Sequence, residues 1–500
     1  MKKCILALML LLPLQAWAQY QETSPEKADS TLVLSLDDAL KIALSENTSI
    51  KVADMEIKRQ KYAKKSAYGA LYPQISATGM YSYAIKKQKV FFGSDDTGDS
   101  GSSGSSGGMS SMMSGVLEPI MYYIQQLYDA TNTPFIPYVA PETTGGTSSE
   151  PIEMGRRNQV QFSISAALQL VNLQLWESLR LTKDQVELTI EKARESRLST
   201  VTSVKQAYYA VLMAKASYDV YNAVLENAAH NLKLTESRYN VQKASAMDLA
   251  RAQSTYAAAI PNLYNAENAI RLGLWQLKAV MGIALDTPID IEGELSDYAE
   301  TMFRDLTEGE NSDLEKNSQL RQLATQAEIL ARQIRMQQYA YIPTLNLSLT
   351  YNYYTQSDKF NLSQWKWLPS STAVVTLTIP IFSGGQRYYT IKQTRVQADE
   401  LQLQRENTER QLRISIRQNL NNMSTAMKTY DAASEALKSA EKAYDVASKS
   451  YEVGKTTFTD LNNTELTLTQ TRLQSAQAVY NFMVAKATLE QTLGYDFTQE

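Results

Sequence analysis

Apolar residues recur at every seventh position along four long stretches of this chain, which is the spacing of helices packed side by side. Two stretches lead into short polar turns, with apolar residues at Val204, Val211, Tyr218, Leu225, Leu232 and Tyr239, and at Ile416, Met423, Tyr430, Leu437, Tyr444 and Tyr451. Two stretches lead away from the turns, through Leu249, Tyr256, Leu263, Ile270 and Leu277, and through Leu461, Leu468, Phe482 and Leu489. The pattern predicts two long helical hairpins.

The two hairpins are copies of each other. The turn at 239–249 matches the turn at 451–461 at a constant offset of 212 residues (451 − 239). A repeat of this length indicates the duplication of half a protein rather than a solenoid unit. Each turn contains Ser/Thr-x-x-Asp, at Ser245–Asp248 and at Thr457–Asp460, which predicts a capped helix start.

Four shorter stretches alternate between apolar and polar residues, which predicts strands with one apolar face: Gln74–Ile85, Val160–Leu170, Thr344–Tyr353 and Ala373–Ile381. Each has about 10–12 residues, the length of a strand that crosses a membrane in a barrel. Tyrosines at the far ends of the first and third strands fit an interfacial aromatic girdle: Tyr81, Tyr83, Tyr351 and Tyr353. A water-soluble sheet with one buried face is the alternative, but small polar residues on the other face favour the barrel.

Helix lengths predict how the helices fit together. Helices are expected at about 37–69, 174–238, 247–282, 313–341, 384–450 and 458–494. The helices that enter the turns are about twice as long as those that leave them. We therefore expect 37–70 to stack end to end on 247–282, and 313–341 to stack on 458–494.

This organisation predicts two structural repeats, 19–285 and 313–500. The linker between them, 286–312, includes a short extended piece at Ile289–Ile291. The second repeat has a short loop between its strands, at about 355–371.

The first repeat carries a long insert between its strands, at about 86–158. Its Gly- and Ser-rich part at 98–113 is typical of disorder. Its part at 117–130 favours a short helix.

The start of the chain predicts a secretory signal peptide over residues 1–18. Lys2 and Lys3 precede an apolar run that ends in the small-x-small sequence Ala16-Trp17-Ala18. Cys4 is the one cysteine of the chain and lies in this segment. We therefore expect no disulfide, thiol catalysis or cysteine-metal site in the mature protein.

Charge and histidine content argue against several functions. The chain has 49 basic and 53 acidic residues and a net charge of −4, which offers no electrostatic basis for binding nucleic acid. His230, the one histidine, is interpreted as an ordinary helix residue. Hydrolase triads and zinc motifs are absent from the sequence, so we expect no enzyme activity, metal or cofactor.

Four strands cannot close a barrel, and open edges are not tolerated in lipid, so closure needs more than one copy. At this point the chain resembles the TolC-type outer-membrane efflux channel family over essentially its whole mature length. The resemblance rests on the duplicated turns, on Pro73 and Pro343 between helix and strand, and on Pro380-Ile381-Phe382-Ser383-Gly384-Gly385. The first half departs from the last feature, with Gln169–Gln174 in its place.

The resemblance implies a fold that is mainly α with a membrane β-barrel. In this family, a homotrimer forms a twelve-stranded barrel in outer-membrane lipid above an α-helical tunnel through the periplasm. It also implies docking to a periplasmic adaptor protein that serves an inner-membrane pump of RND or ABC type. The function would be passive conduction of exported solutes or proteins after a gate at the tip opens.

The family's gate residues correspond to positions in the turns. Asp460 matches the first of two aspartates that form acidic rings, and Asn463 stands where the second would be; Asp248 is the first-half acid. Tyr451 matches a tyrosine whose hydrogen bond helps to hold the tip shut. Candidate adaptor contacts are the remaining turn residues Val241, Gln242, Val453, Gly454 and Lys455.

Other functions remain open on the sequence alone. The main alternative is a non-conducting periplasmic coiled-coil scaffold or adaptor protein, which predicts no conductance in bilayers. A general porin would need longer barrels and no tunnel. An enzyme is the most distant alternative.

Overall fold

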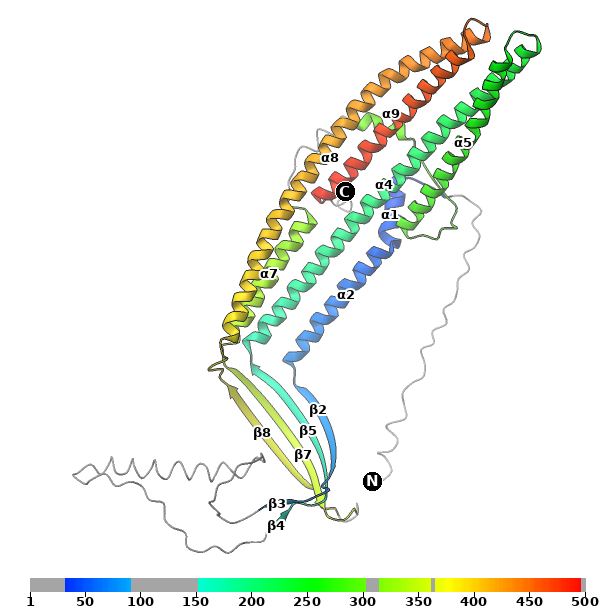
Figure 1. Ribbon diagram of the computed structural model, residues 1–500. Coiled ribbons are helices and arrows are strands. Elements are labelled where there is room, and N and C mark those ends of the chain that lie inside the picture. The colour runs from blue at the N-terminus through cyan, green and yellow to red at the C-terminus, as the bar shows by residue number, and fades with distance from the viewer. Residues whose placement is uncertain (1–31, 91–151, 303–313, 361–364, 496–500) are drawn as a thin grey trace, which may run out of the picture. The chain divides into compact units, whose positions relative to one another are not determined.

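The computed structural model describes residues 32–90, 152–302, 314–360 and 365–495. The expected signal peptide, the Gly- and Ser-rich stretch and the short helix of the insert lie outside these residues. The described chain forms two compact units, and each unit draws segments from both halves of the sequence. One unit is helical and the other contains the main sheet (Figure 1).

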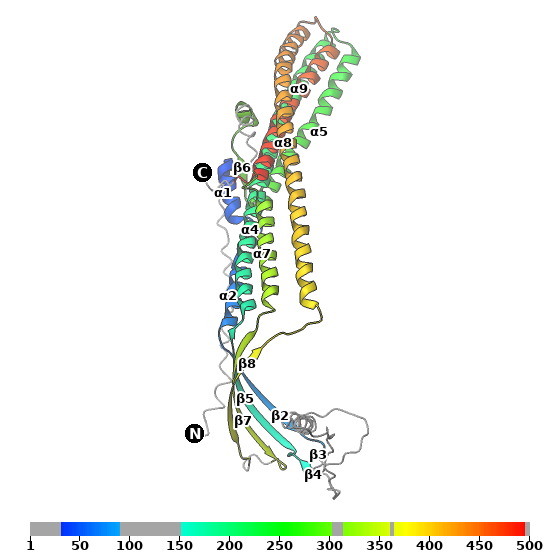
Figure 2. The same ribbon diagram turned by 90° about the vertical axis from the view of Figure 1, so that its left-hand side faces the viewer.

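The helical unit is built on two hairpins. In one, α4 (Leu173–Asn240) pairs with α5 (Ala246–Met281), and in the other, α8 (Gln386–Glu452) pairs with α9 (Phe458–Leu493). α4 also packs along α9, so the hairpins lie side by side (Figures 1 and 2). The four long helices predicted from the heptad spacing are confirmed. α8 begins two residues later than expected, because Gly384 and Gly385 have φ angles of 61° and 80°.

Three shorter helices complete the unit, α1 (Leu36–Glu46), α2 (Thr48–Tyr68) and α7 (Ser318–Tyr339). The expected single helix at 37–69 is wrong, because the chain breaks at Asn47, where ψ is 129°. The Asn47 side chain accepts hydrogen bonds from the N–H groups of Ser49 and Ile50, so it caps a new helix. The 3-10 helix η1 (Gly69–Leu71) follows α2.

Two short helices stack end to end on the helices that leave the turns, α2 on α5 and α7 on α9. Nδ2 of Asn47 donates to the carbonyl of Val280 at 2.6 Å, which joins α2 to α5. Nδ2 of Asn317 donates to the carbonyl of Thr492 at 2.6 Å, which joins α7 to α9. The predicted stacking is confirmed, with α2 in place of the whole first helix.

Each joint is closed by a glycine in the left-handed region. Gly282 ends α5 with φ of 80°, and Gly494 ends α9 with φ of 76°. A Cβ atom at Gly282 would lie 2.7 Å from the carbonyl oxygen of Glu46, and one at Gly494 would collide with the carbonyl oxygen of Lys316. Both positions therefore need glycine for conformation and for space.

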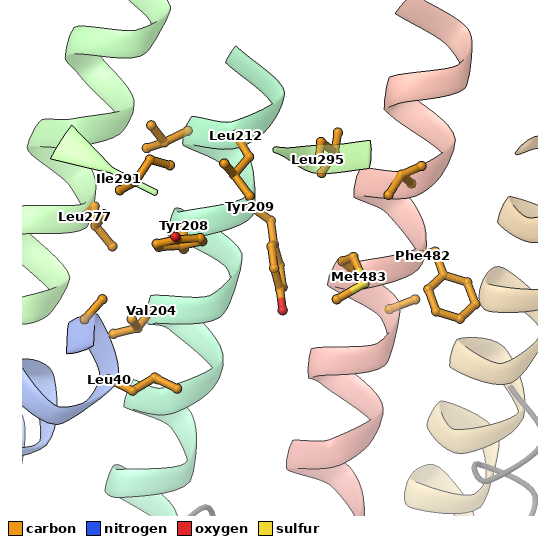
Figure 3. Close-up of a cluster of buried hydrophobic side chains, with 14 of the residues drawn as sticks. Leu40, Val204, Tyr208, Tyr209, Leu212, Leu277, Ile291, Leu295, Phe482 and Met483 are labelled. Atoms are coloured by element: carbon orange, nitrogen blue, oxygen red, sulfur yellow. The ribbon is translucent and has the colours of Figure 1, made fainter. Parts of the chain in front are cut away.

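The main apolar core lies where the hairpins meet a small layer of extended chain. β1 (Leu32–Leu34) pairs in parallel with β6 (Ile289–Ile291), and η2 (Leu295–Thr301) follows β6. Side chains from α1, α4, α5, α9 and this layer fill the core, among them Leu40, Tyr208, Leu277, Ile291 and Phe482 (Figure 3). The sequence predicts the extended piece at 289–291, where apolar and polar residues alternate, but not β1, where Leu32, Val33 and Leu34 are all apolar and show no alternation.

α4 faces α7 through buried acidic residues spaced by seven, Glu177, Asp184 and Glu191. Arg332 lies 3.5 Å from Glu177 and also bonds Asp184, while Arg321 lies 3.1 Å from Glu191. Ion pairs thus occupy heptad positions that apolar residues usually fill, and they set the alignment of α7 on α4.

The strand unit holds a sheet in the order β2 (Gln74–Tyr83), β5 (Asn158–Val171), β7 (Thr344–Ser357) and β8 (Leu368–Thr378). β2 and β5 are antiparallel, with Ile75 opposite Ala166. Hydroxyl groups meet on the other face, where Ser76 Oγ lies 2.8 Å from Ser165 Oγ. The apolar and polar faces predicted for these two strands are confirmed.

The fourth strand is displaced from its predicted position. β8 covers Leu368–Thr378 instead of 373–381, because Pro380 has no N–H to donate to a neighbouring strand. β7 and β8 both extend into the loop expected at 355–371. A short antiparallel pair at the base of the insert, β3 (Gln88–Val90) and β4 (Ile152–Met154), was not expected from the sequence.

Candidate functional site

The two turns that end the hairpins share one backbone geometry. The N–H of Gln242 donates to the carbonyl of Tyr239 at 2.9 Å, and the N–H of Gly454 donates to that of Tyr451 at 3.0 Å. In both turns the following N–H donates to a carbonyl five residues earlier at 2.8 Å, from Lys243 to Arg238 and from Lys455 to Ser450. Gln242 has φ of 59° and Gly454 has φ of 76°, so the first turn places a side chain where the second has none.

Tyr451 is a contact between the two hairpins. Its side chain is 4% exposed, and its hydroxyl lies 2.7 Å from Oγ1 of Thr235 on α4. Because the Thr235 hydroxyl donates to the Asn231 carbonyl at 2.7 Å, the Tyr451 hydroxyl is the donor to Thr235. The Arg238 guanidinium lies 4.7 Å from the centre of the Tyr451 ring and donates to the Tyr451 carbonyl. The role of this contact as a lock stays a prediction.

A small group of buried side chains, the tip cluster, surrounds this contact and consists of Ala252, Tyr451, Phe458 and Leu461. It is separate from the main core. Nearby, Nη1 of Arg251 on α5 donates to Oγ1 of Thr459 on α9 at 3.0 Å. The tip cluster, the Tyr451 contacts and this hydrogen bond therefore join the two hairpins near their turns.

Asp460 lies exposed at the start of α9, where it forms a helix cap. The Thr457 hydroxyl donates to Oδ2 of Asp460 at 2.7 Å, and the Asp460 N–H donates to the Thr457 hydroxyl at 3.1 Å. The Thr457 hydrogen bond holds the pKa of Asp460 below its ordinary value, so the carboxylate stays charged at neutral pH. Asn463 is exposed one turn further along the same face. Asp248 makes the equivalent cap with Ser245 at 2.7 Å.

The candidate adaptor contacts lie on the surface of the turns. Val241 is 62% exposed and Val453 is 67% exposed, so each turn presents an apolar side chain to solvent. Gln242, Gly454 and Lys455 are also exposed. Exposed valines on a turn suit docking of another protein, and their role in adaptor docking stays a prediction.

Two of the four expected girdle tyrosines, Tyr81 and Tyr353, contact other aromatic side chains in the strand unit, while Tyr83 and Tyr351 are exposed. Tyr81 is 54% exposed and Tyr353 is 39% exposed. Tyr353 stacks on Trp367 with ring centres 5.0 Å apart, and Phe162 lies 5.8 Å from the same tryptophan. Tyr81 packs edge-on against Phe360 at 6.2 Å. The sequence pattern did not assign Trp367, Phe360 and Phe162 to the girdle, because the first two lie in the expected loop at about 355–371 and Phe162 lacks a tyrosine's polar end.

The remaining chemistry is sparse. Within the described ranges, no group of three or more His, Cys, Asp or Glu side chains is arranged to hold a metal ion. In the same residues, no helix has both the length and the apolar character needed for a membrane crossing.

A sheet with an exposed apolar face and an aromatic border, in a chain that also forms duplicated helical hairpins, is the architecture of outer-membrane efflux channels. The chain belongs to the outer membrane efflux protein family, whose model matches residues 124–283 and 311–495. The protein is therefore an outer-membrane efflux channel, and a non-conducting scaffold is not favoured. Its family is one of transport channels and not of enzymes.

Known proteins resemble the chain in sequence and in fold. The outer membrane proteins TolC of Salmonella enteritidis and of Escherichia coli K12 are both 23% identical to it, over 67% and 66% of this chain and 69% of each relative. The outer membrane protein VceC of Vibrio cholerae matches with a TM-score of 0.64 at 14% identity, covering 92% of this chain and 96% of that one. The open state of the MtrE channel of Neisseria gonorrhoeae matches with a TM-score of 0.61 at 14% identity, covering 92% and 88%.

Proposed function

We propose that three copies of this chain form one duct, with twelve strands in the outer membrane and the helical hairpins in the periplasm. The observation that carries the proposal is the four-stranded sheet, which has two open edges and apolar residues such as Ile75 exposed on one face. Lipid does not tolerate open edges, and about eight or more strands are needed to enclose an interior. A trimer supplies the missing strands. Residues 1–18 would direct the chain across the inner membrane as a signal peptide.

The gate of this duct is assigned to the helical tips. In a trimer, threefold symmetry brings three copies of Asp460 around one axis, and each carboxylate accepts the Thr457 hydrogen bond that favours its charged form. Like charges at close range repel, attract cations and hinder anions, and salt weakens each of these effects. Asn463 adds polarity without charge, so a single acidic ring gives mild cation selectivity.

The turns form the docking surface in this proposal. Val241 and Val453 offer apolar contact, and Gly454 offers open backbone with no atom within 4 Å of an added Cβ. Gln242 and Lys455 add polar groups beside them. The partner is a periplasmic adaptor protein that serves an inner-membrane pump of RND or ABC type, and the pump supplies the energy for export.

Reversal potentials across a salt gradient in planar bilayers test the gate. Asp460→Asn is expected to reduce cation preference and weaken block by multivalent cations, and Asn463→Asp is expected to increase both. Asp248→Asn makes the same change in the equivalent cap of the other hairpin, and the shift it produces measures what the first-half acid contributes to the gate. If Asp460→Asn left the reversal potential unshifted, Asp460 would be a helix cap alone. If the wild-type protein gave no conductance, the duct itself would be rejected.

A further inference from the structure

A carboxyl group is buried between the hairpins, close to the tip cluster. Glu465 on α9 is 6% exposed, and its Oε1 atom has no hydrogen-bond partner within the described part of the chain. It lies four residues after Leu461 and three before Leu468, which are 1% and 5% exposed. Glu465 therefore occupies the buried heptad stripe of α9, where an apolar side chain is usual.

Within the described part of the chain, no cation forms an ion pair with Glu465. The Asn227 amide of α4 acts to lower the pKa of Glu465, and the Glu465 charge acts to raise the pKa of the Tyr444 hydroxyl on α8, so both side chains lie close to the carboxyl. Arg472, the nearest cation along α9, is paired with Glu441 of α8 at 3.0 Å. Among the described residues, no ion pair of Glu465 is formed.

The titratable side chains on the facing stretch of α4 lie exposed on its surface: Glu226, His230, Lys233 and Glu236. Nε2 of His230 lies 3.9 Å from Glu452 at the end of α8. The buried side chains of this stretch are uncharged, namely Ala228, Asn231 and Thr235. A charged Glu465 would thus have an amide nearby but no counter-ion among the described residues.

Burial without a counter-ion disfavours the charged form of a carboxyl group. Burial raises the pKa of Glu465 to about 7. Burial and the Glu465 charge raise the pKa of the nearby Tyr444 hydroxyl to about 12. The apolar contacts available to oppose this cost are few, because the tip cluster is small and separate from the main core.

We propose that Glu465 is a proton-operated latch: it is protonated while the second hairpin packs against α4, and it releases its proton when the helices separate and water reaches the carboxyl. The proposal rests on the proposed function only in linking this separation to the opening of the gate. The ligand of the site is a proton, so the pH of the surrounding compartment regulates the tip.

The direction of the effect follows from linkage. Below the ordinary carboxyl pKa of 4.5, Glu465 carries a proton in both states, so pH has no effect. Between 4.5 and about 7, the separated state has lost the proton and the packed state retains it, so rising pH favours separation. Above this window both states are charged and the effect levels off. Acid therefore tightens the tip, and neutral pH loosens it.

The test measures how readily a thiol reagent reaches the contact between the hairpins. Ala447→Cys places a thiol on α8 among the side chains packed on the tip cluster, in a full-length protein that lacks Cys4. Modification rates are compared with and without Glu465→Gln at each pH, so that the titration of the thiol cancels. The rate measured with Glu465 intact, divided by the rate measured in the Glu465→Gln variant, should rise between pH 5 and 7.5, by up to about 100-fold.

Two further variants make the result decisive. Glu435→Gln changes an exposed carboxylate of α8, and its rate ratio should not vary with pH. Glu465→Leu should give slow modification at every pH, and it replaces Glu465→Gln if the amide variant fails to fold.

A carbonyl band of a protonated carboxyl, lost in Glu465→Gln, should appear in infrared difference spectra below pH 7.

The outcomes separate the latch from the channel. A rate ratio that stays flat with pH overturns the latch, even if the protein conducts in bilayers. A pH-dependent ratio in a protein that gives no conductance supports the latch and rejects the duct.

Discussion

The two hairpin turns have the same backbone hydrogen bonds but different side-chain surroundings. Tyr451 and Tyr239 match at the offset of 212 residues, yet Tyr451 is 4% exposed and Tyr239 is 42% exposed. The second turn sends its tyrosine across to α4, whereas the first leaves its tyrosine on the surface. The turn geometry therefore persists without the contact, so only the second turn joins the hairpins through its tyrosine.

The left-handed position differs in the same way. Gly454 fits its φ of 76° without strain, while Gln242 holds φ of 59° with a full side chain. An L residue in this region costs about 1–2 kcal/mol. The first turn is thus strained at a point where its copy is relaxed, and it keeps its shape because the same two hydrogen bonds close it.

The largest loss of stability is expected at Gly494, the glycine of the joint between α7 and α9. Gly494 and Gly454 both have φ of 76°, but an added Cβ meets the Lys316 carbonyl oxygen at Gly494 and nothing within 4 Å at Gly454. We expect Gly494→Ala to lower the free energy of unfolding by on the order of 4 kcal/mol, and Gly454→Ala by about 1–2 kcal/mol. Denaturant unfolding in detergent, followed by helical circular dichroism, measures both. Equal losses would show that the joint tolerates a side chain.

A smaller effect is expected from the tyrosine pair. Tyr451→Phe removes the donor to Thr235, whose side chain is fully buried, and should cost about 1–2 kcal/mol. Tyr239→Phe, the matched change on the surface, should stay within about 0.5 kcal/mol. Hydrogen exchange of the amides at the two turns gives the local opening free energy in each variant. Similar values for the two would mean that the contact between the hairpins adds no stability.

The smallest effect is expected from relief of strain in the first turn. Gln242→Gly should stabilise the turn by about 0.5 kcal/mol, since glycine removes the left-handed strain but is more flexible when unfolded. The reverse change, Gly454→Gln, should destabilise the second turn by a similar or larger amount. Slower exchange of the Lys243 amide in Gln242→Gly is the sign to look for, and faster exchange would contradict it.

The sequence predicted the long helices well because heptad spacing is a local and repeated feature. It missed the break at Asn47, since an asparagine cap inside an otherwise helical pattern looks like an ordinary polar residue. It misplaced the fourth strand, although Pro380 marked where that strand had to end. These errors concern short segments, where a single side chain outweighs the pattern.

The candidate site was predicted in part. The matched turns and caps followed from the duplication. The left-handed conformation of Gln242 could be predicted from its alignment with Gly454. The partners of Tyr451 could not be predicted from the sequence, because Thr235 and Arg238 lie more than 200 residues away on another hairpin. Glu465 falls on the apolar stripe of α9, so a polar residue at a heptad core position was the available sign.

The joints also determine the order in which the chain is able to fold. The hydrogen bond from Asn47 to Val280 spans 233 residues, and the one from Asn317 to Thr492 spans 175. α2 and α7 must therefore wait for helices made much later in synthesis before their ends are covered. Contacts of such high contact order form slowly and leave helix ends exposed to aggregation in the meantime. The last turn of α9 supplies the Thr492 carbonyl of the second joint, so the N-terminal end of α7 is covered only after the end of α9 has been synthesised.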